Sequence, residues 1–195
     1  MTAELGVRER KKLAARKALT DAALTLFERN GFDATTVNDI ASLAGMSPRT
    51  FFRYFNAKED VVFHKSGQHL EALRAILRER PASETNSAAL RPALVTFAEI
   101  LEEEQDEIQW RARLANSSRA LTERNAIELQ SWCLALAEEL LRRPGRPDVT
   151  RCHLLGAAGV QVLSIAIMLR TDSEQTLPQL TDHCYNELVH VICIT

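Results

Sequence analysis

TVNDIASLAGMSPRTFFRYFNAKE, residues 36–59, is the stretch of sequence that decides the fold. Thr36 followed three residues later by Asp39 is the pattern of a capping box, in which two side chains satisfy free backbone N–H groups at a helix start. Gly45 supplies the left-handed backbone conformation that ends a short helix. Ser47 is a second N-cap residue, and the proline after it suits the first helical position. The stretch therefore predicts two short helices joined by a tight glycine turn.

Longer helices are predicted on both sides of this pair. Residues 8–30 place apolar side chains at helical spacing before Gly31, which predicts a helix that stops at that glycine. Asn56 and Glu59 form another capping-box pattern, which predicts a long helix to about Arg80. Two short helices that are clasped in this way form a helix-turn-helix.

The rest of the chain has the composition of helices. Ala, Leu, Glu and Arg dominate it, and Val, Ile and Thr do not alternate with polar residues over any length. We therefore expect an all-α fold of about nine helices, with a three-helix helix-turn-helix domain over residues 1–56 and a helical domain over residues 57–195. The later helices of the second domain are predicted over residues 86–104, 106–117, 119–143, 148–170 and 176–193.

Charge is distributed unevenly along the 195 residues. The formal net charge is −2, yet the first 20 residues carry six Lys and Arg side chains against two Glu. Residues 47–58 hold Arg49, Arg53 and Lys58 together with four aromatic side chains and no acidic one. A basic end on a mildly acidic body favours a local anionic partner over general polycation behaviour.

The cysteine spacing and the apolar runs favour a cytoplasmic protein. The four cysteines are widely spaced and form no CxxC pair, which is typical of reduced, buried thiols. The N-terminus has no apolar signal core. Residues 154–169 form the longest near-apolar run, and these 16 residues fall short of the roughly 20 that span a bilayer. We expect no membrane partner.

Sequence signatures of an enzyme are missing. The chain has no Gly-rich phosphate loop, no GxSxG or HExxH pattern and no paired cysteines. His183, Glu187 and His190 share one helical face, a pattern that can hold zinc but is more often a solvated face. We expect no catalytic residue, no metal and no cofactor.

The sequence TTVNDIASLAGMSPRTFFRYFNAKEDV resembles the DNA-binding domain of the tetracycline-repressor (TetR) family of bacterial regulators, over about residues 10–62. Three positions depart from the family pattern: Arg49 stands where Gly is frequent, Phe52 where Tyr is frequent and Asn56 where Pro is frequent. The resemblance implies a DNA-binding transcriptional regulator of about this length, with a helical domain for effector binding and dimerisation. The positions that carry the match are the Thr-Thr-Val start, Ile40, Ala41, Gly45, Ser47, Thr50, Tyr54, Phe55, Lys58 and Glu59.

DNA recognition is predicted for the second short helix, from Ser47 to Phe55, in the major groove. Phosphate contacts supply affinity and position, whereas contacts to base edges supply sequence specificity. Arg49 is the predicted base reader because a guanidinium fits the two acceptors of guanine, and Arg53 follows one turn later. Arg53 and the lysine of this stretch have the alternative role of solvated charges, and Phe51 is expected in the core. The predicted DNA contacts are Thr36, Ser47, Arg49, Thr50, Arg53, Tyr54 and Lys58, with Arg8 and Lys11 of the basic end.

One helix-turn-helix reads only a few base pairs, so we expect a twofold homodimer on a palindromic double-stranded DNA operator. Two apolar stripes on the last two predicted helices would form a four-helix bundle with their symmetry mates. The alternative is that one stripe belongs to the core of the single chain. The stripes are Leu154, Ala158, Val162, Ile165 and Leu169, and then Leu180, Cys184, Leu188 and Val191.

A second face of the helix predicted over residues 148–170 mixes polar with apolar residues, which is typical of a pocket wall for a small-molecule effector. Two tryptophans of the second domain are candidates for the other walls, although a tryptophan is more often a core residue. Gln161 has the alternative of bonding a backbone carbonyl. The predicted pocket comprises Phe97, Leu101, Trp110, Trp132, His153, Gln161, Ser164 and Met168.

The second half of the chain is similar to the C-terminal domain of TetR-type regulators linked to mycofactocin gene clusters. The residues that carry this resemblance are QWRARLANSSRALTERNAIELQSWCLALAEEL and the Ala- and Leu-rich helix after Pro144-Gly-Arg-Pro147. The resemblance implies an apolar, elongated effector such as a fatty acyl group. The sequence thus favours a repressor that such an effector releases from its operator. A TetR-type activator and a ligand-free architectural DNA binder are the alternatives.

Overall fold

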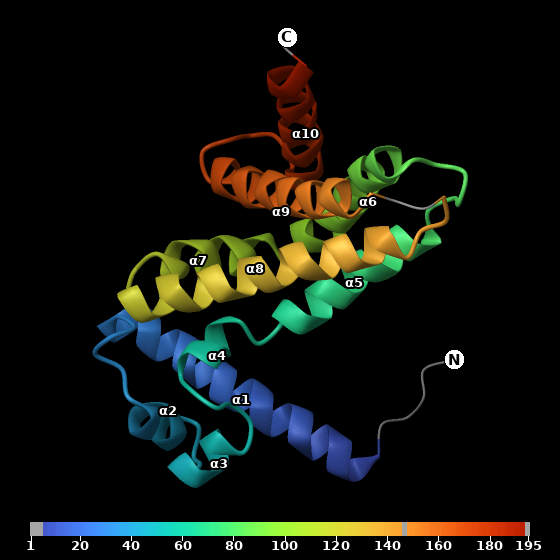
Figure 1. Cartoon of the computed structure of the whole chain (residues 1–195). Helices are drawn as coiled ribbons and strands as arrows, with labels where there is room; N and C mark the ends of the chain where they lie inside the picture. The colour runs from blue at the N-terminus through green and yellow to red at the C-terminus, as the bar shows by residue number, and fades with distance from the viewer. Residues whose placement is uncertain (1–5, 146–147, 194–195) are drawn as a thin grey trace. The chain divides into compact units, whose positions relative to one another are not determined.

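The computed structural model of the chain describes residues 6–145 and 148–193, and Figure 1 traces its helices. Every element in this part of the chain is an α-helix, so the all-α fold predicted from the sequence is confirmed. The helices are α1 (Val7–Asn30), α2 (Val37–Leu43), α3 (Pro48–Phe52), α4 (Glu59–Val62), α5 (Ser66–Glu79), α6 (Asn86–Glu102), α7 (Gln105–Ala115), α8 (Arg119–Leu141), α9 (Val149–Arg170) and α10 (Leu177–Cys193).

The chain divides into two compact units. The first holds the described residues up to His64 together with Ser117–Leu121. The second holds Lys65–Asn116 and the described residues from Thr122 onward. This division falls later in the chain than residue 56, where the sequence places the end of the helix-turn-helix domain.

Local capping signals set several helix ends at the positions expected from the sequence. The backbone N–H of Gly31, at φ 80°, donates to the carbonyl of Phe27 and closes α1. The hydroxyl of Thr85 accepts from the N–H of Ala88 at 3.2 Å and opens α6. Because such signals act over three or four residues, these helix ends can be predicted from the sequence alone.

The single long helix predicted after Asn56 is wrong, because the structure has α4 and α5 with a break between them. The carboxylate of Asp60, not that of Glu59, accepts hydrogen bonds from the backbone N–H groups of Asn56 (3.0 Å) and Ala57 (3.3 Å). Phe63 leaves helical geometry at φ −102° and ψ 17°, so α4 is only one turn long.

The core of the first unit is built from α1 to α4. α1 packs on α2 and α4, and α2 packs on α3. α2 has seven residues and α3 has five, which is too short for an isolated helix to be stable in water. Their stability therefore depends on apolar burial against α1. The fully buried side chains of this core are Leu19, Ala23, Ile40, Ala41, Phe51, Val61 and Val62.

The core of the second unit is built mainly from α5, α6, α9 and α10, with Leu136 and Leu140 of α8 and Ile108 of α7. α6 packs on each of the other three helices, and α9 packs on α10. Length and composition alone would allow α9 to cross a membrane. Its side chains Val160, Val162 and Leu163 belong to this core, as expected of a central helix in a folded domain.

Helices α8 and α9 approach closely at Gly156. A β-carbon at this position would lie 2.6 Å from the carbonyl oxygen of Cys133 and 2.9 Å from the backbone nitrogen of Ala137. Both atoms are backbone, so a whole helix would have to move to relieve the contact. A β-carbon at Gly159, by contrast, would meet side-chain methyl groups, two of Leu90 at 3.4 Å and one of Leu94 at 3.5 Å.

We therefore predict that Gly156→Ala lowers the free energy of unfolding by about 1–3 kcal/mol, the usual cost of overpacking a core. Gly159→Ala is the matched control, because a flexible side chain can yield there and alanine favours helix. Urea unfolding followed by circular dichroism, at one protein concentration, measures both variants. Equal stability of the two variants would contradict the close approach of α8 and α9.

Candidate nucleic-acid interface

The capping box at Thr36 is present and opens α2. The Asp39 backbone N–H donates to the Thr36 hydroxyl at 3.2 Å, and the Thr36 N–H donates to the Asp39 carboxylate at 2.9 Å. Hydrogen bonds from the side chain and the backbone of Thr36 lower the pKa of the Asp39 carboxyl. α2 ends at a turn in which Gly45 has φ 66° and the N–H of Met46 donates to the carbonyl of Ala41 at 2.8 Å.

Helix α3 starts at this turn. The Ser47 hydroxyl accepts from the N–H of Thr50 at 3.2 Å and lies 3.0 Å from the Thr50 hydroxyl. α3 ends at Phe52 rather than at Phe55, the end expected from the sequence. The following backbone bonds, such as Phe55 N–H to the Phe51 carbonyl at 3.0 Å, continue the turn without extending the helix.

Two aromatic side chains fix α3 to the first unit. Phe51 and Phe55 are both buried, and their ring centroids are 5.4 Å apart. The guanidinium of Arg16 on α1 lies 5.4 Å from the centroid of the Phe55 ring and donates to the carbonyl of His64 at 3.2 Å. These contacts leave the opposite side of α3 outside the core.

The outward side of α3 is basic and partly apolar. Arg49, Phe52 and Arg53 are spaced three and four residues apart, so they share one helix face, and all three are exposed. With Ser47 and Thr50 they line a hollow that no carboxylate faces. The Arg53 guanidinium lies 5.0 Å from the centroid of the Tyr54 ring and donates to its hydroxyl at 3.3 Å.

The structure gives Lys58 a different role from the predicted phosphate contact. Its ammonium donates to the carbonyls of Phe32 (2.7 Å), Thr35 (2.8 Å) and Asp33 (3.4 Å), and it lies 4.2 Å from the Phe32 ring centroid. An ammonium has three donors, so these carbonyls occupy all of them. Lys58 therefore ties the loop between α1 and α2 to the start of α4.

The basic N-terminal end is helical. Arg8 and Lys11 are exposed in the first two turns of α1, where Lys12 pairs with Glu9 at 3.6 Å. Their long side chains are free to reach an anionic surface, and the predicted contacts of Arg8 and Lys11 with DNA stay predictions.

The residues of the predicted effector pocket do not surround a common cavity. Phe97 and Leu101 are packed in the core of the second unit, whereas His153, Gln161 and Met168 are exposed. The second face of α9 is exposed at His153, Gln161 and Met168 and half-buried at Ser164, and its role as a pocket wall stays a prediction. The remaining members are Trp110, which is half-buried, Ser164, whose hydroxyl donates to the Val160 carbonyl, and Trp132, whose indole N–H donates to the Ser66 hydroxyl.

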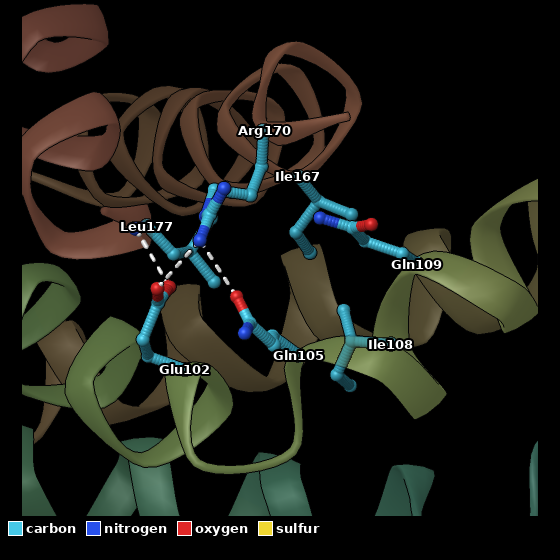
Figure 2. Close-up of a pocket in the computed structure, with 7 residues that line it drawn as sticks. All are labelled: Glu102, Gln105, Ile108, Gln109, Ile167, Arg170 and Leu177. Atoms are coloured by element: carbon cyan, nitrogen blue, oxygen red, sulfur yellow. Dashed lines mark hydrogen bonds and ion pairs between the residues drawn. The ribbon is translucent and has the colours of Figure 1, made fainter. Parts of the chain in front are cut away.

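A small cavity of about 10 Å³ lies instead where α6, α7, α9 and α10 meet. Arg170 crosses it and donates to Glu102 (3.1 Å) and Gln105 (2.7 Å), as Figure 2 shows. The other carboxylate oxygen of Glu102 accepts from the backbone N–H of Leu177 at 2.7 Å. The space is about that of one water molecule. The site is therefore a set of hydrogen bonds that links α6, α7, α9 and α10, and it is too small for an organic ligand.

A network of charged side chains joins α5 to α7 in the second unit. The Lys65 ammonium bonds Glu104 (2.9 Å) and Glu107 (2.6 Å), and Glu107 also pairs with Arg111 at 2.9 Å. His69 lies 3.3 Å from Glu104 and is buried, and burial lowers the pKa of its imidazole. Glu104 and Glu107, in the charge run of residues 102–107, therefore form ion pairs within the second unit.

The two predicted dimer stripes divide between the core and the surface. Val162 and Leu180 are buried in the single chain. Leu154 and Val191 are 67% and 70% exposed. Other exposed apolar side chains on α9 and α10 are Val149, Ile165, Met168, Leu169 and Val189, while Ala158, Cys184 and Leu188 are half-buried.

Comparison with known proteins relates the first unit to one family. The family model for bacterial regulatory proteins of the tetR family matches residues 19–64. The HTH-type transcriptional regulator TcmR of Streptomyces glaucescens is 41% identical over 45% of this chain, and the alignment spans 39% of TcmR. The Mycobacterium tuberculosis protein named mycofactocin biosynthesis transcriptional regulator MftR is 29% identical over 72% of this chain and 74% of its own length.

Solved structures share the fold of both units. FadR of Thermus thermophilus, a TetR-family transcriptional repressor solved in complex with lauroyl-CoA, superimposes with a TM-score of 0.57 at 24% identity. The match covers 92% of this chain and 96% of that one. At this identity the similarity establishes the fold, an N-terminal helix-turn-helix followed by a helical domain.

The contacts of Lys58 yield a test. Lys58→Met should lower the free energy of unfolding by about 2 kcal/mol, because the partly buried carbonyls of Phe32 and Thr35 lose a charged donor. Arg49→Met, which changes an exposed side chain, should alter it by less than about 0.5 kcal/mol. Urea unfolding measures both variants. If Lys58→Met left the stability unchanged but weakened DNA binding, that result would support the predicted contact between Lys58 and a DNA phosphate.

Proposed function

We propose that this chain, which belongs to the tetR family of bacterial regulatory proteins, represses transcription by binding a palindromic operator as a homodimer. A small, largely apolar effector releases it from the DNA. The observation that carries the DNA-binding part is the outward face of α3, where two arginines stand exposed around a hollow without any carboxylate.

In this proposal α3 enters the major groove and Arg49 binds a guanine. Arg49 lies in the first turn of α3, at the end that the glycine turn leaves open to solvent. A guanidinium can donate two parallel hydrogen bonds to the O6 and N7 atoms of guanine. Arg53 is positioned by Tyr54, whose hydroxyl and ring hold the guanidinium beside the same face. Thr36, Ser47, Thr50 and the cations Arg8 and Lys11 contribute contacts to the phosphates.

The homodimer of the proposal uses the outer sides of α9 and α10. These helices expose Leu154, Ile165 and Val191 to solvent in the single chain. Contiguous exposed apolar surface on a folded domain marks an interaction site. A second copy that packs against it would complete a four-helix bundle and set the distance between two α3 helices.

We propose that the protein acts in the cytoplasm, where its DNA is. The proposed effector is a fatty acyl compound. The repressor FadR of Thermus thermophilus was solved with lauroyl-CoA, which supports this chemical class. The cavity at Arg170 has room for about one water molecule, so an acyl chain that binds there would have to open the second unit. If the second unit opened by breaking the ion pairs of Lys65 with Glu104 and Glu107, the start of α5 would lose these contacts and could move.

A ligand-free architectural DNA binder is the second candidate function. The small volume of the cavity at Arg170, in the part of the chain that the structure describes, favours it. An architectural protein would bind many DNA sequences through phosphates, with a steep dependence on salt.

Fluorescence anisotropy of the full chain on short duplexes, tiled across the DNA beside its own gene, tests the repressor. One tile should bind tightly at two salt concentrations. Arg49→Ala should weaken that binding at least tenfold, because one bidentate guanine contact is worth about 1–3 kcal/mol in each half-site. Arg113→Ala, which removes an exposed arginine from α7 of the second unit, is the control. Equal binding to every tile would favour the architectural function.

The same complex tests the effector. Lauroyl-CoA should weaken the affinity for the tight tile by about 5- to 150-fold, the usual range of coupling between two sites. Free coenzyme A is the control, since it lacks the acyl chain. Tight, sequence-specific binding that responds to neither compound would exclude this effector class and leave the DNA-binding function standing.

A further inference from the structure

Phe52 is the one exposed aromatic side chain among the residues that the structure describes, and 55% of it is open to solvent. It stands on the outward face of α3, between Arg49 and Arg53. The other aromatic side chains of the first unit are buried or half-buried. An exposed phenyl ring on the face that would contact DNA suggests that Phe52 itself touches the DNA, in addition to the two arginines.

Contact with the buried Phe51 ring restrains the orientation of the Phe52 ring. It packs edge-on against the Phe51 ring, with centroids 5.6 Å apart and an angle of 87° between the ring planes. Phe51 is fully buried, so it is itself held in place by the core. An edge-to-face pair of this kind restrains the outer ring, and Phe52 therefore presents a defined apolar surface to solvent.

The chemistry of this face selects one kind of contact for Phe52. A phenyl ring has no hydrogen-bond donor, so it cannot bind a phosphate oxygen as the neighbouring arginines can. Among the groups on the major-groove edges of base pairs, the 5-methyl of thymine is the apolar one. We propose that Phe52 reads a thymine by packing on its 5-methyl group, and this inference rests on the proposed binding of α3 in the major groove.

The thymine should lie beside the guanine that Arg49 binds. Arg49 and Phe52 are three residues apart, which is about 4.5 Å along a helix axis. Successive bases on one strand are about 3.4 Å apart. The guanine and the thymine are thus expected within one or two base pairs of each other in each half-site.

Replacing thymine by deoxyuridine tests the inference, because this change removes only the methyl group. A duplex that the full chain selects from a randomised pool serves as the probe. One thymine position in each half-site should lose about fourfold in affinity on replacement, the effect of one apolar carbon withdrawn from contact. Replacement in both half-sites should lose about 15-fold.

The variant Phe52→Ala should bind the thymine and deoxyuridine duplexes equally, whereas Phe52→Leu should keep a preference for thymine. Leu43→Ala, which removes an exposed apolar side chain from α2, should keep the full preference. The inference is overturned if the wild-type chain ignores the methyl group at every thymine, or if Phe52→Ala still senses it. Failure to select any duplex would instead reject the proposed function.

Discussion

Burial of the Phe51 ring is the interaction on which the DNA-facing surface depends. α3 has five residues and could not persist as a free helix. The Ser47 cap and the packing of Phe51 on the core hold it in place. Because the helix is short and rigidly anchored, the exposed positions of Arg49, Phe52 and Arg53 follow from which face Phe51 buries. The same packing thus creates the fold of the first unit and its candidate site.

Features that depend on neighbouring residues in the chain were predictable from the sequence. The capping box at Thr36, the turn at Gly45 and the cap at Ser47 all act within a few residues, and the structure has each of them. The capping box predicted at Asn56 and Glu59 is not formed as expected, because Glu59 and Asp60 are both carboxylates near the same free N–H groups, and the pattern does not say which one accepts from them.

Features that depend on distant residues were not predictable in the same way. Lys58 reads as a surface cation in a basic stretch, but its partners lie more than twenty residues earlier, at Phe32 and Thr35. Gln161 reads as part of a pocket wall, but α6 and α10 decide which face of α9 is buried. Glu102 belongs to an acidic run, and only the fold brings Arg170 to it. Sequence patterns identify candidates of this kind, and packing assigns their roles.

The central claim is that α3 lies in the major groove with Arg49 on a guanine. Protection of guanine N7 from dimethyl sulfate measures this directly, because N7 is open only in the major groove and is one of the two atoms that Arg49 would bind. The wild-type chain should protect one guanine in each half-site, and Arg49→Ala should lose that protection while still shielding the flanking backbone. A bound complex in which no guanine N7 is protected, or in which Arg49→Ala protects the same guanines, would contradict the account.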